Sequence, residues 1–148
     1  MSLRQWLANG WLKPHVTDSQ EIGNLLAMVD RDISDASKEA ISTDWRFGIA
    51  YNAALKLCTI LLFIHGFRPE NTLAHYRSLL SLPYTLGREW QEETIFLNAC
   101  RMKRNMLEYD CCGNIKEEEV SELLQHVLKL KHAVITYLSN TGNLPQNI

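Results

Sequence analysis

Apolar residues return every three or four positions along most of this 148-residue chain, and that spacing is typical of helices that bury one face. It predicts helices at about residues 2–12, 17–40, 45–65, 71–82, 88–109 and 115–140. No stretch shows the alternation of a strand. We therefore expect an all-α fold: an up-and-down helical bundle of four main helices plus a short N-terminal helix. Residues 1–148 would form a single domain, with a core at about 17–140 and a flexible tail at 141–148.

Residues 45–65 are apolar almost all round the predicted helix, and only Asn52, Lys56 and Thr59 form a narrow polar stripe. A helix of this kind is normally the central one of its bundle. Its most apolar run, residues 49–64, is shorter than a membrane span requires. We expect a cytoplasmic protein that makes no contact with a membrane.

Two stripes of residues run along the predicted helix at 88–109. The first is apolar throughout, which predicts the core face: Ile95, Ala99, Met102, Met106 and Tyr109. The opposite stripe begins apolar and ends charged: Trp90, Thr94, Leu97, Arg101, Arg104 and Glu108. A face that starts with large apolar side chains and ends in charges is typical of a protein interface beside a polar cleft. We therefore predict a homodimer interface at Trp90, Thr94 and Leu97.

Composition excludes several classes of function. The net charge is −2, so binding to nucleic acid would have to depend on a local cluster of basic residues and not on the overall charge of the protein. The four cysteines lack the spacings of zinc sites, and the sequence contains no Gly-rich phosphate loop, metalloprotease motif or serine-nucleophile elbow. We expect no metal and no cofactor.

The remaining candidates for a functional site are polar residues near the end of the helix predicted at 88–109. Arginine can hold a phosphate through two parallel hydrogen bonds, so Arg101, Arg104 and Asn105 are candidates for an anion- or RNA-binding site. The structural alternative is that Arg104 simply pairs with Glu108 one helical turn later.

The run Arg101-x-Lys103-Arg104-Asn105-x-x-x-Tyr109-Asp110 resembles the signature of HEPN domains, Arg-x(4–6)-His, in which a polar residue often follows the arginine. Residues 44–54 (DWRFGIAYNAA) resemble the helix of that family that carries a tyrosine among small apolar residues. Residues 75–79 (HYRSL) are similar to a connecting-helix segment of some members. The resemblance extends over roughly residues 1–140.

This resemblance implies a helical bundle that dimerises and brings the arginine motifs of two subunits into one cleft. Many HEPN domains are metal-independent ribonucleases, often toxins partnered with a small nucleotidyltransferase antitoxin, whereas others bind nucleic acid or nucleotides without cutting. Arg104 matches the family arginine and Asn105 its polar neighbour. Positions 109–111 hold Tyr109, Asp110 and Cys111 where the family histidine would fall. Near neutral pH a tyrosine exchanges protons much less readily than a histidine does.

The hypothesis we favour is a non-catalytic or weakly active HEPN-like module that binds nucleic acid or nucleotides within a toxin–antitoxin or nucleotidyltransferase-associated system. The first alternative is a metal-independent HEPN ribonuclease in which Arg104 and Tyr109 are the catalytic candidates. The second alternative is a purely structural or protein-interaction bundle. The spacing of Tyr109 on the apolar stripe favours a structural role for that residue.

Overall fold

The computed structural model describes residues 1–110 and 115–146, and it describes side chains for all of these except residues 107–110. The helices are α1 (Leu3–Ala8), α2 (Ser19–Ala36), α3 (Thr43–Ile64), α4 (Ala74–Leu80), α5 (Leu82–Thr85), α6 (Gln91–Asp110) and α7 (Glu117–Asn140). A 3-10 turn, η1 (Arg88–Trp90), leads into α6, and the two short strands are β1 (Leu12–Pro14) and β2 (Phe67–Pro69). The chain is mostly helical, which confirms the expected all-α class.

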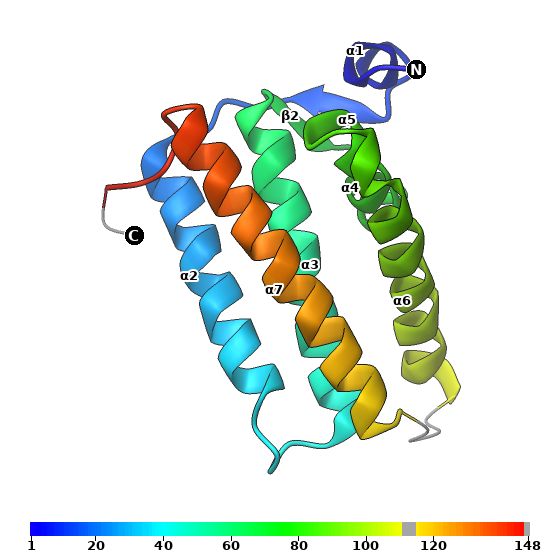
Figure 1. Ribbon diagram of the computed structural model, residues 1–148. Coiled ribbons are helices and arrows are strands. Elements are labelled where there is room, and N and C mark those ends of the chain that lie inside the picture. The colour runs from blue at the N-terminus through cyan, green and yellow to red at the C-terminus, as the bar shows by residue number, and fades with distance from the viewer. Residues whose placement is uncertain (111–114, 147–148) are drawn as a thin grey trace.

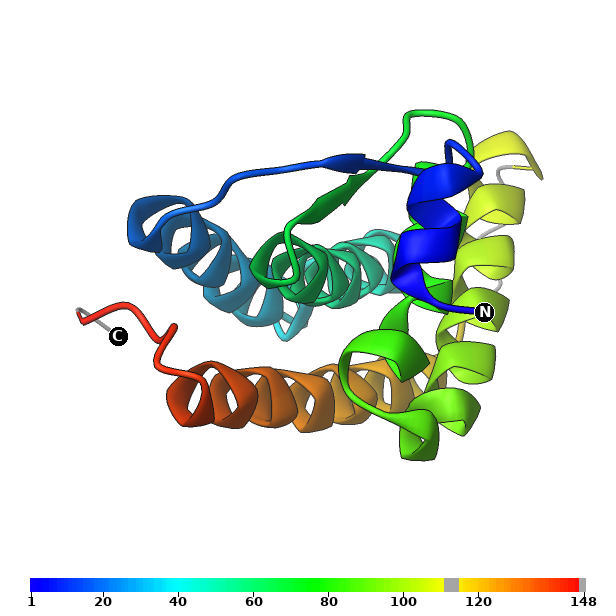
Figure 2. The ribbon, with the colours of Figure 1, turned by 90° about the horizontal axis from the view of Figure 1, so that it is seen from above.

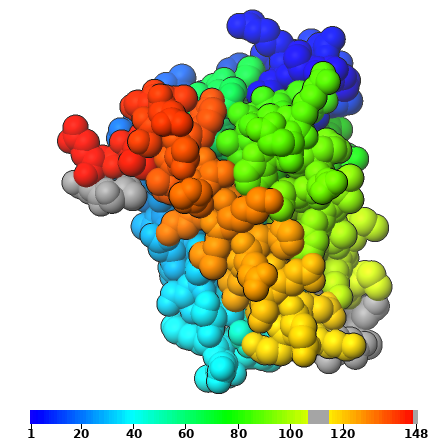
Figure 3. Space-filling view, viewed as in Figure 1, coloured from blue at the N-terminus to red at the C-terminus, as the bar shows by residue number. Residues whose placement is uncertain are grey.

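The four long helices α2, α3, α6 and α7 run alternately from one end of the molecule to the other (Figure 1). Seen from above, α3 is central, α2 and α7 lie against it, and α4 and α5 lie between α3 and α6 (Figure 2). On the face shown in the space-filling view, the side chains of α7 and α6 meet and cover α3 (Figure 3).

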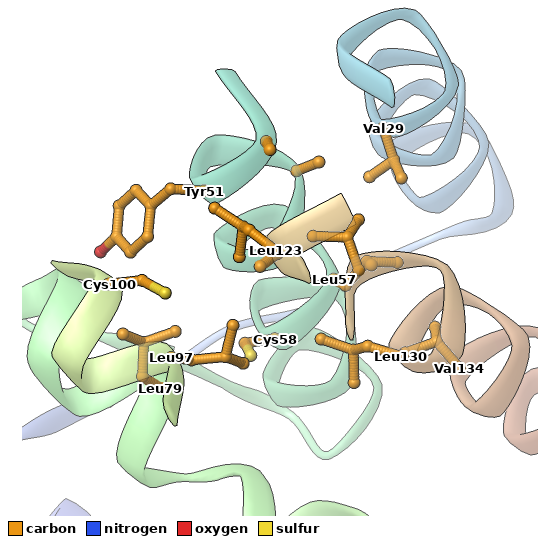
Figure 4. Close-up of a cluster of buried hydrophobic side chains, with 14 of the residues drawn as sticks. Val29, Tyr51, Leu57, Cys58, Leu79, Leu97, Cys100, Leu123, Leu130 and Val134 are labelled. Carbon is orange, nitrogen blue, oxygen red and sulfur yellow. The ribbon is translucent and has the colours of Figure 1, made fainter. Parts of the chain in front are cut away.

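Helix α3 is the most deeply buried element, as its hydrophobic circumference predicts. Ala50, Ala53 and Ala54 are completely buried, and their small side chains let neighbouring helices approach closely. Leu57 and Leu61 are also 0% exposed. Figure 4 shows Leu57 inside a cluster that receives side chains from α2, α6 and α7.

With 22 residues and a mean hydropathy of 1.8 in its most apolar window, α3 is long and apolar enough to cross a membrane. The helix extends beyond the apolar run at residues 49–64, on which the sequence expectation rested, and begins at Thr43. Within that window 56% of the residues are buried inside the molecule, and a core helix of a soluble protein can also be this long and this apolar.

Polar contacts fix the ends of the long helices. Asp18 caps α2 by accepting a hydrogen bond from the backbone N–H of Glu21 at 2.8 Å. The buried Arg46 of α3 donates from Nε to the carbonyl oxygen of Ala36 at 2.7 Å, and from Nη1 to Glu117 Oε2 at 2.7 Å. One guanidinium thus joins the end of α2 to the starts of α3 and α7.

The two-stranded antiparallel sheet was not expected. It pairs Leu12 with Pro69 and Pro14 with Phe67, and each strand is three residues long and ends on proline. Strands this short contain too few residues to show an alternating pattern. The sheet carries Leu12 and the α1 residue Trp6 onto Leu62 of α3, forming a second small cluster.

The segment between β2 and α6 also differs from the prediction of one helix ending at Pro83. Leu73 adopts a left-handed conformation with φ 58° just before α4, and Ser81 separates α4 from α5. Pro83 lies inside α5, in the first turn, where the missing N–H of a proline removes no helical hydrogen bond.

The described part of the tail packs onto the bundle, although the sequence suggested a flexible segment at 141–148. Leu144 packs against the main core, and Pro145 is buried beside Gly23 of α2. Residues 147–148 lie outside the described part of the chain.

We predict that Leu57→Ala lowers the free energy of unfolding by about 2–5 kcal/mol, because it leaves a cavity at the centre of the core. Leu128→Ala on α7 is the control, since Leu128 is 51% exposed and its truncation should change stability by less than about 0.5 kcal/mol. Urea unfolding followed by circular dichroism measures both variants. Equal effects of the two substitutions would contradict the central position of α3.

Candidate anion site

The faces of α6 are the reverse of those predicted. Thr94 and Leu97 are only 3% and 1% exposed, whereas Ile95, Met102 and Met106 are 62%, 55% and 62% exposed. The stripe assigned to the core therefore faces solvent. Thr94 and Leu97, which were assigned to a dimer interface, are instead buried inside a single chain, and that assignment was wrong.

The cause is that the buried polar residues on this face of α6 have hydrogen-bond partners. Glu93 is 7% exposed, and its carboxylate accepts a hydrogen bond from Lys129 Nζ at 2.8 Å and lies 2.7 Å from His126 Nδ1. Burial raises the pKa of Glu93, but the bonds to Lys129 and His126 outweigh that effect and hold the pKa below its ordinary value. The second buried polar group on this face, Thr94 Oγ1, donates to the carbonyl oxygen of Trp90 at 2.9 Å.

These contacts join α6 to α7. The ring of His126 stacks on Phe96 at 4.0 Å between centroids, and Lys129 Nζ lies 5.2 Å from the centroid of the Trp90 ring. The Trp90 end of the predicted dimer interface is therefore also occupied by contacts within the chain.

Arg101 and Arg104 lie on the same side of α6, and that side faces α3 and α4. Arg101 donates from Nε to Asn98 Oδ1 at 2.9 Å, and its guanidinium carbon lies 5.1 Å from the centroid of the Tyr76 ring. The guanidinium carbon of Arg104 lies 5.6 Å from the centroid of the Tyr51 ring. Both arginines are half-buried. Their charged groups thus converge on aromatic residues from two other helices, which is a favourable setting for a cation.

The sequence analysis did not name Tyr51 as a candidate site residue. This residue of α3 is 0% exposed, and its hydroxyl turns toward α6 on the side of Cys100 (Figure 4). The hydroxyl has no hydrogen-bond partner among the described residues. A buried polar group without a partner costs about 1–3 kcal/mol. Such a group therefore needs an explanation.

Burial keeps the hydroxyl of Tyr51 in its neutral, protonated form. Burial raises the pKa of Tyr51 far above its ordinary value, and the positive charges of Arg104 and Arg101 counteract only part of that rise. The residue is therefore a phenol at neutral pH and offers an O–H donor.

Two further residues neighbour Tyr51 or Arg104. His75, an exposed residue of α4, has its ring centroid 6.1 Å from that of Tyr51. Asn105, the third predicted member of the site, follows Arg104 on α6 and is half-buried. The site therefore draws its side chains from α3, α4 and α6 of one chain.

The described residues near the site offer no activated thiol. Burial raises the pKa values of Cys58 and Cys100 to about 12, so both thiols stay protonated at neutral pH and are poor nucleophiles. The part of the chain that the structure describes also contains no group of three side chains suited to hold a metal ion.

Several predicted features fall outside the described side chains. The backbone of α6 is helical through Asp110, but the side chains of Glu108 and Tyr109 are not described, and neither is Cys111. The pairing of Arg104 with Glu108 and the role of Tyr109 therefore stay predictions. The stripe that suggested a core position for Tyr109 is exposed at Met102 and Met106, so that spacing no longer favours a structural role.

Two surface hollows lie elsewhere, beside α2. One is lined by residues of α2 together with Phe63, and the other by residues of α2 and the C-terminal segment. Neither hollow includes Arg101, Arg104 or Tyr51. The buried hydroxyl is thus not exposed on the floor of either hollow.

No family model, curated protein or solved structure matches this chain. The function has to be argued from the arrangement of the residues themselves.

We predict that Leu97→Glu lowers the free energy of unfolding by about 4 kcal/mol or more, because it places an unpaired carboxylate in the core. The matched control, Leu128→Glu, changes an exposed leucine of α7 and should keep the native stability within about 0.5 kcal/mol. Urea unfolding distinguishes the two. A folded, fully stable Leu97→Glu chain would restore the view that this side of α6 is an external surface.

Proposed function

We propose that this chain is a HEPN-like module that binds nucleic acid or nucleotides through Arg101 and Arg104, with Asn105 at the edge of the site. The module is non-catalytic or only weakly active, works in the cytoplasm and belongs to a toxin–antitoxin or nucleotidyltransferase-associated system. The observation that carries this proposal is that Arg104 lies over the ring of Tyr51 and Arg101 over the ring of Tyr76, on the helix toward which the buried Tyr51 hydroxyl turns, and that this hydroxyl has no hydrogen-bond partner among the described residues.

The surroundings of Arg101 favour an anionic ligand. Its described partners are the amide oxygen of Asn98 and the ring of Tyr76, neither of which carries a negative charge. A guanidinium has five N–H donors in a planar fork that matches phosphate oxygens. A phosphate at this point would supply the negative charge that those partners lack. A local site of this kind is compatible with an overall charge of −2.

One observation favours the ribonuclease alternative. The ring centroid of His75 lies 6.1 Å from that of Tyr51, although His75 comes from α4 and not from the family position at the end of α6. A histidine can exchange protons near neutral pH, as metal-independent cleavage of RNA requires. Cleavage would therefore depend on His75 in addition to Arg104.

A homodimer stays part of the proposal, but on a different surface. The exposed residues Ile95, Ala99, Met102 and Met106 form a continuous apolar stripe along the outer side of α6. A twofold axis near Ala99 would pair this stripe with itself in an isologous interface. Arg104 lies on the opposite side of the helix, so each subunit would keep its own anion site.

The first test of the binding proposal is the affinity for a fluorescein-labelled single-stranded RNA, measured by anisotropy. Arg104→Ala should weaken binding by about 10-fold or more, because a hydrogen bond to a charged group is worth roughly 1.5–3 kcal/mol. Binding by the wild-type chain should also weaken as salt rises. Arg88→Ala is the matched control, since it removes the same charge from an exposed position on η1.

The binding proposal would be wrong if Arg104→Ala, Arg88→Ala and the wild-type chain bound the RNA with equal affinity. The same samples, incubated with the RNA in EDTA and resolved on a gel, test the alternative. Cleavage that disappears in both His75→Ala and Arg104→Ala would select the ribonuclease. Absence of both binding and cleavage would leave the structural or protein-interaction bundle.

For the dimer, we predict that light scattering reports twice the chain mass and that Met102→Glu shifts the mass to that of a monomer. The reason is that the substitution would place two like charges in an apolar, self-paired interface. Leu128→Glu, on the exposed side of α7, should leave the mass unchanged. A wild-type monomer at high concentration contradicts the dimer.

A further inference from the structure

We infer that the buried hydroxyl of Tyr51 is a ligand of this site and that the group it receives is a terminal phosphate of a nucleotide or of an RNA end. This inference rests on the proposed function and names the class of ligand. It adds to the two arginines a binding residue from α3 that the sequence analysis did not assign to the site.

The first support is the hydroxyl itself. Tyr51 lies among alanines and leucines of the core, where a phenylalanine would fill the same space without introducing a polar atom. Its O–H is fully buried and has no partner among the described residues. The hydroxyl has therefore lost its contact with water without gaining a hydrogen bond within the described fold. A ligand oxygen would supply that bond.

The second support is the direction from which a ligand would come. The hydroxyl points toward α6 (Figure 4). The half-buried Arg101 and Arg104 of that helix act on it as positive charges. Arginine side chains are long and have several rotatable bonds, so a modest change of rotamer can expose the hydroxyl between them. The phenol would then form the inner end of the site, and the guanidinium groups would form its sides.

The geometry favours a phosphate at the end of a molecule over one within a strand. A phosphodiester inside a strand must leave the site in two directions, whereas a terminal phosphate can enter a dead end and offers three free oxygens. Those oxygens match one phenol and two guanidinium groups. A terminal phosphate also carries about −1.5 to −2 charges at neutral pH, which suits two adjacent cations better than the single charge of a diester.

The experiment compares ligands with and without the terminal phosphate on the purified full-length chain. The probes are AMP against adenosine, and one RNA 12-mer bearing either a 5′-phosphate or a 5′-hydroxyl. Wild-type chain should prefer each phosphorylated probe by about 10-fold or more. Tyr51→Phe should remove most of that preference while leaving the affinity for adenosine and for the 5′-hydroxyl RNA unchanged.

Stability without ligand gives a second readout that a structural tyrosine would not produce. Because the hydroxyl has no described partner, Tyr51→Phe should unfold at the same urea concentration as the wild type or at a higher one. Tyr84→Phe is the matched control, since Tyr84 is 41% exposed on α5 and should alter neither binding nor stability. A lower unfolding midpoint for Tyr51→Phe would show that the hydroxyl serves the fold, and would overturn the inference.

Two other outcomes separate this inference from the proposed function. If Arg104→Ala loses RNA binding but the wild-type chain binds the 5′-phosphate and 5′-hydroxyl RNAs equally, the inference is wrong and the proposed function stands. If wild-type chain binds none of the four probes, both are wrong.

Discussion

The burial of α3 on every side is the constraint on which the rest of this structure depends. Because this helix is apolar almost all round, α2, α4, α6 and α7 must surround it, and its alanines let them come close. The same constraint carries Tyr51 into the interior, since that residue lies on the helix one position after Ala50. The polar end of its side chain then meets α6, and α6 brings two positive charges to that point.

Helix α6 can face this core only because its polar side chains have partners. Glu93 is held by Lys129 and His126 of α7 at one end, and Arg101 and Arg104 lie over aromatic rings of α4 and α3 at the other. An inner face of this composition is stable when each charge is paired or stacked. The charged side chains of α6 therefore lie on its inner face. Its apolar residues lie on the outer face, where they are available to contact a second copy of the chain.

The fold could be predicted from the sequence where the hydrophobic pattern alone determines the position of a helix. The central position of α3 and the Asp18 cap of α2 follow from local spacing. The orientation of α6 was not predictable, because Glu93 becomes an acceptable core residue only through partners 33 and 36 positions away in the sequence. Arg101, Arg104 and Asn105 could be named as site candidates from their motif, whereas the resemblance of residues 44–54 to the family helix gave Tyr51 no role in a site. A tyrosine among small apolar residues is an ordinary core residue until its three-dimensional neighbours show that its hydroxyl lacks a partner.

The central claim is that Tyr51, Arg101 and Arg104 form one anion site beneath α6. A crystal structure of the chain grown with AMP tests it most directly. The account predicts phosphate oxygens within about 2.5–3.2 Å of the Tyr51 hydroxyl and of at least one guanidinium nitrogen. An ordered water on the Tyr51 hydroxyl, with AMP bound elsewhere or not at all, would contradict it.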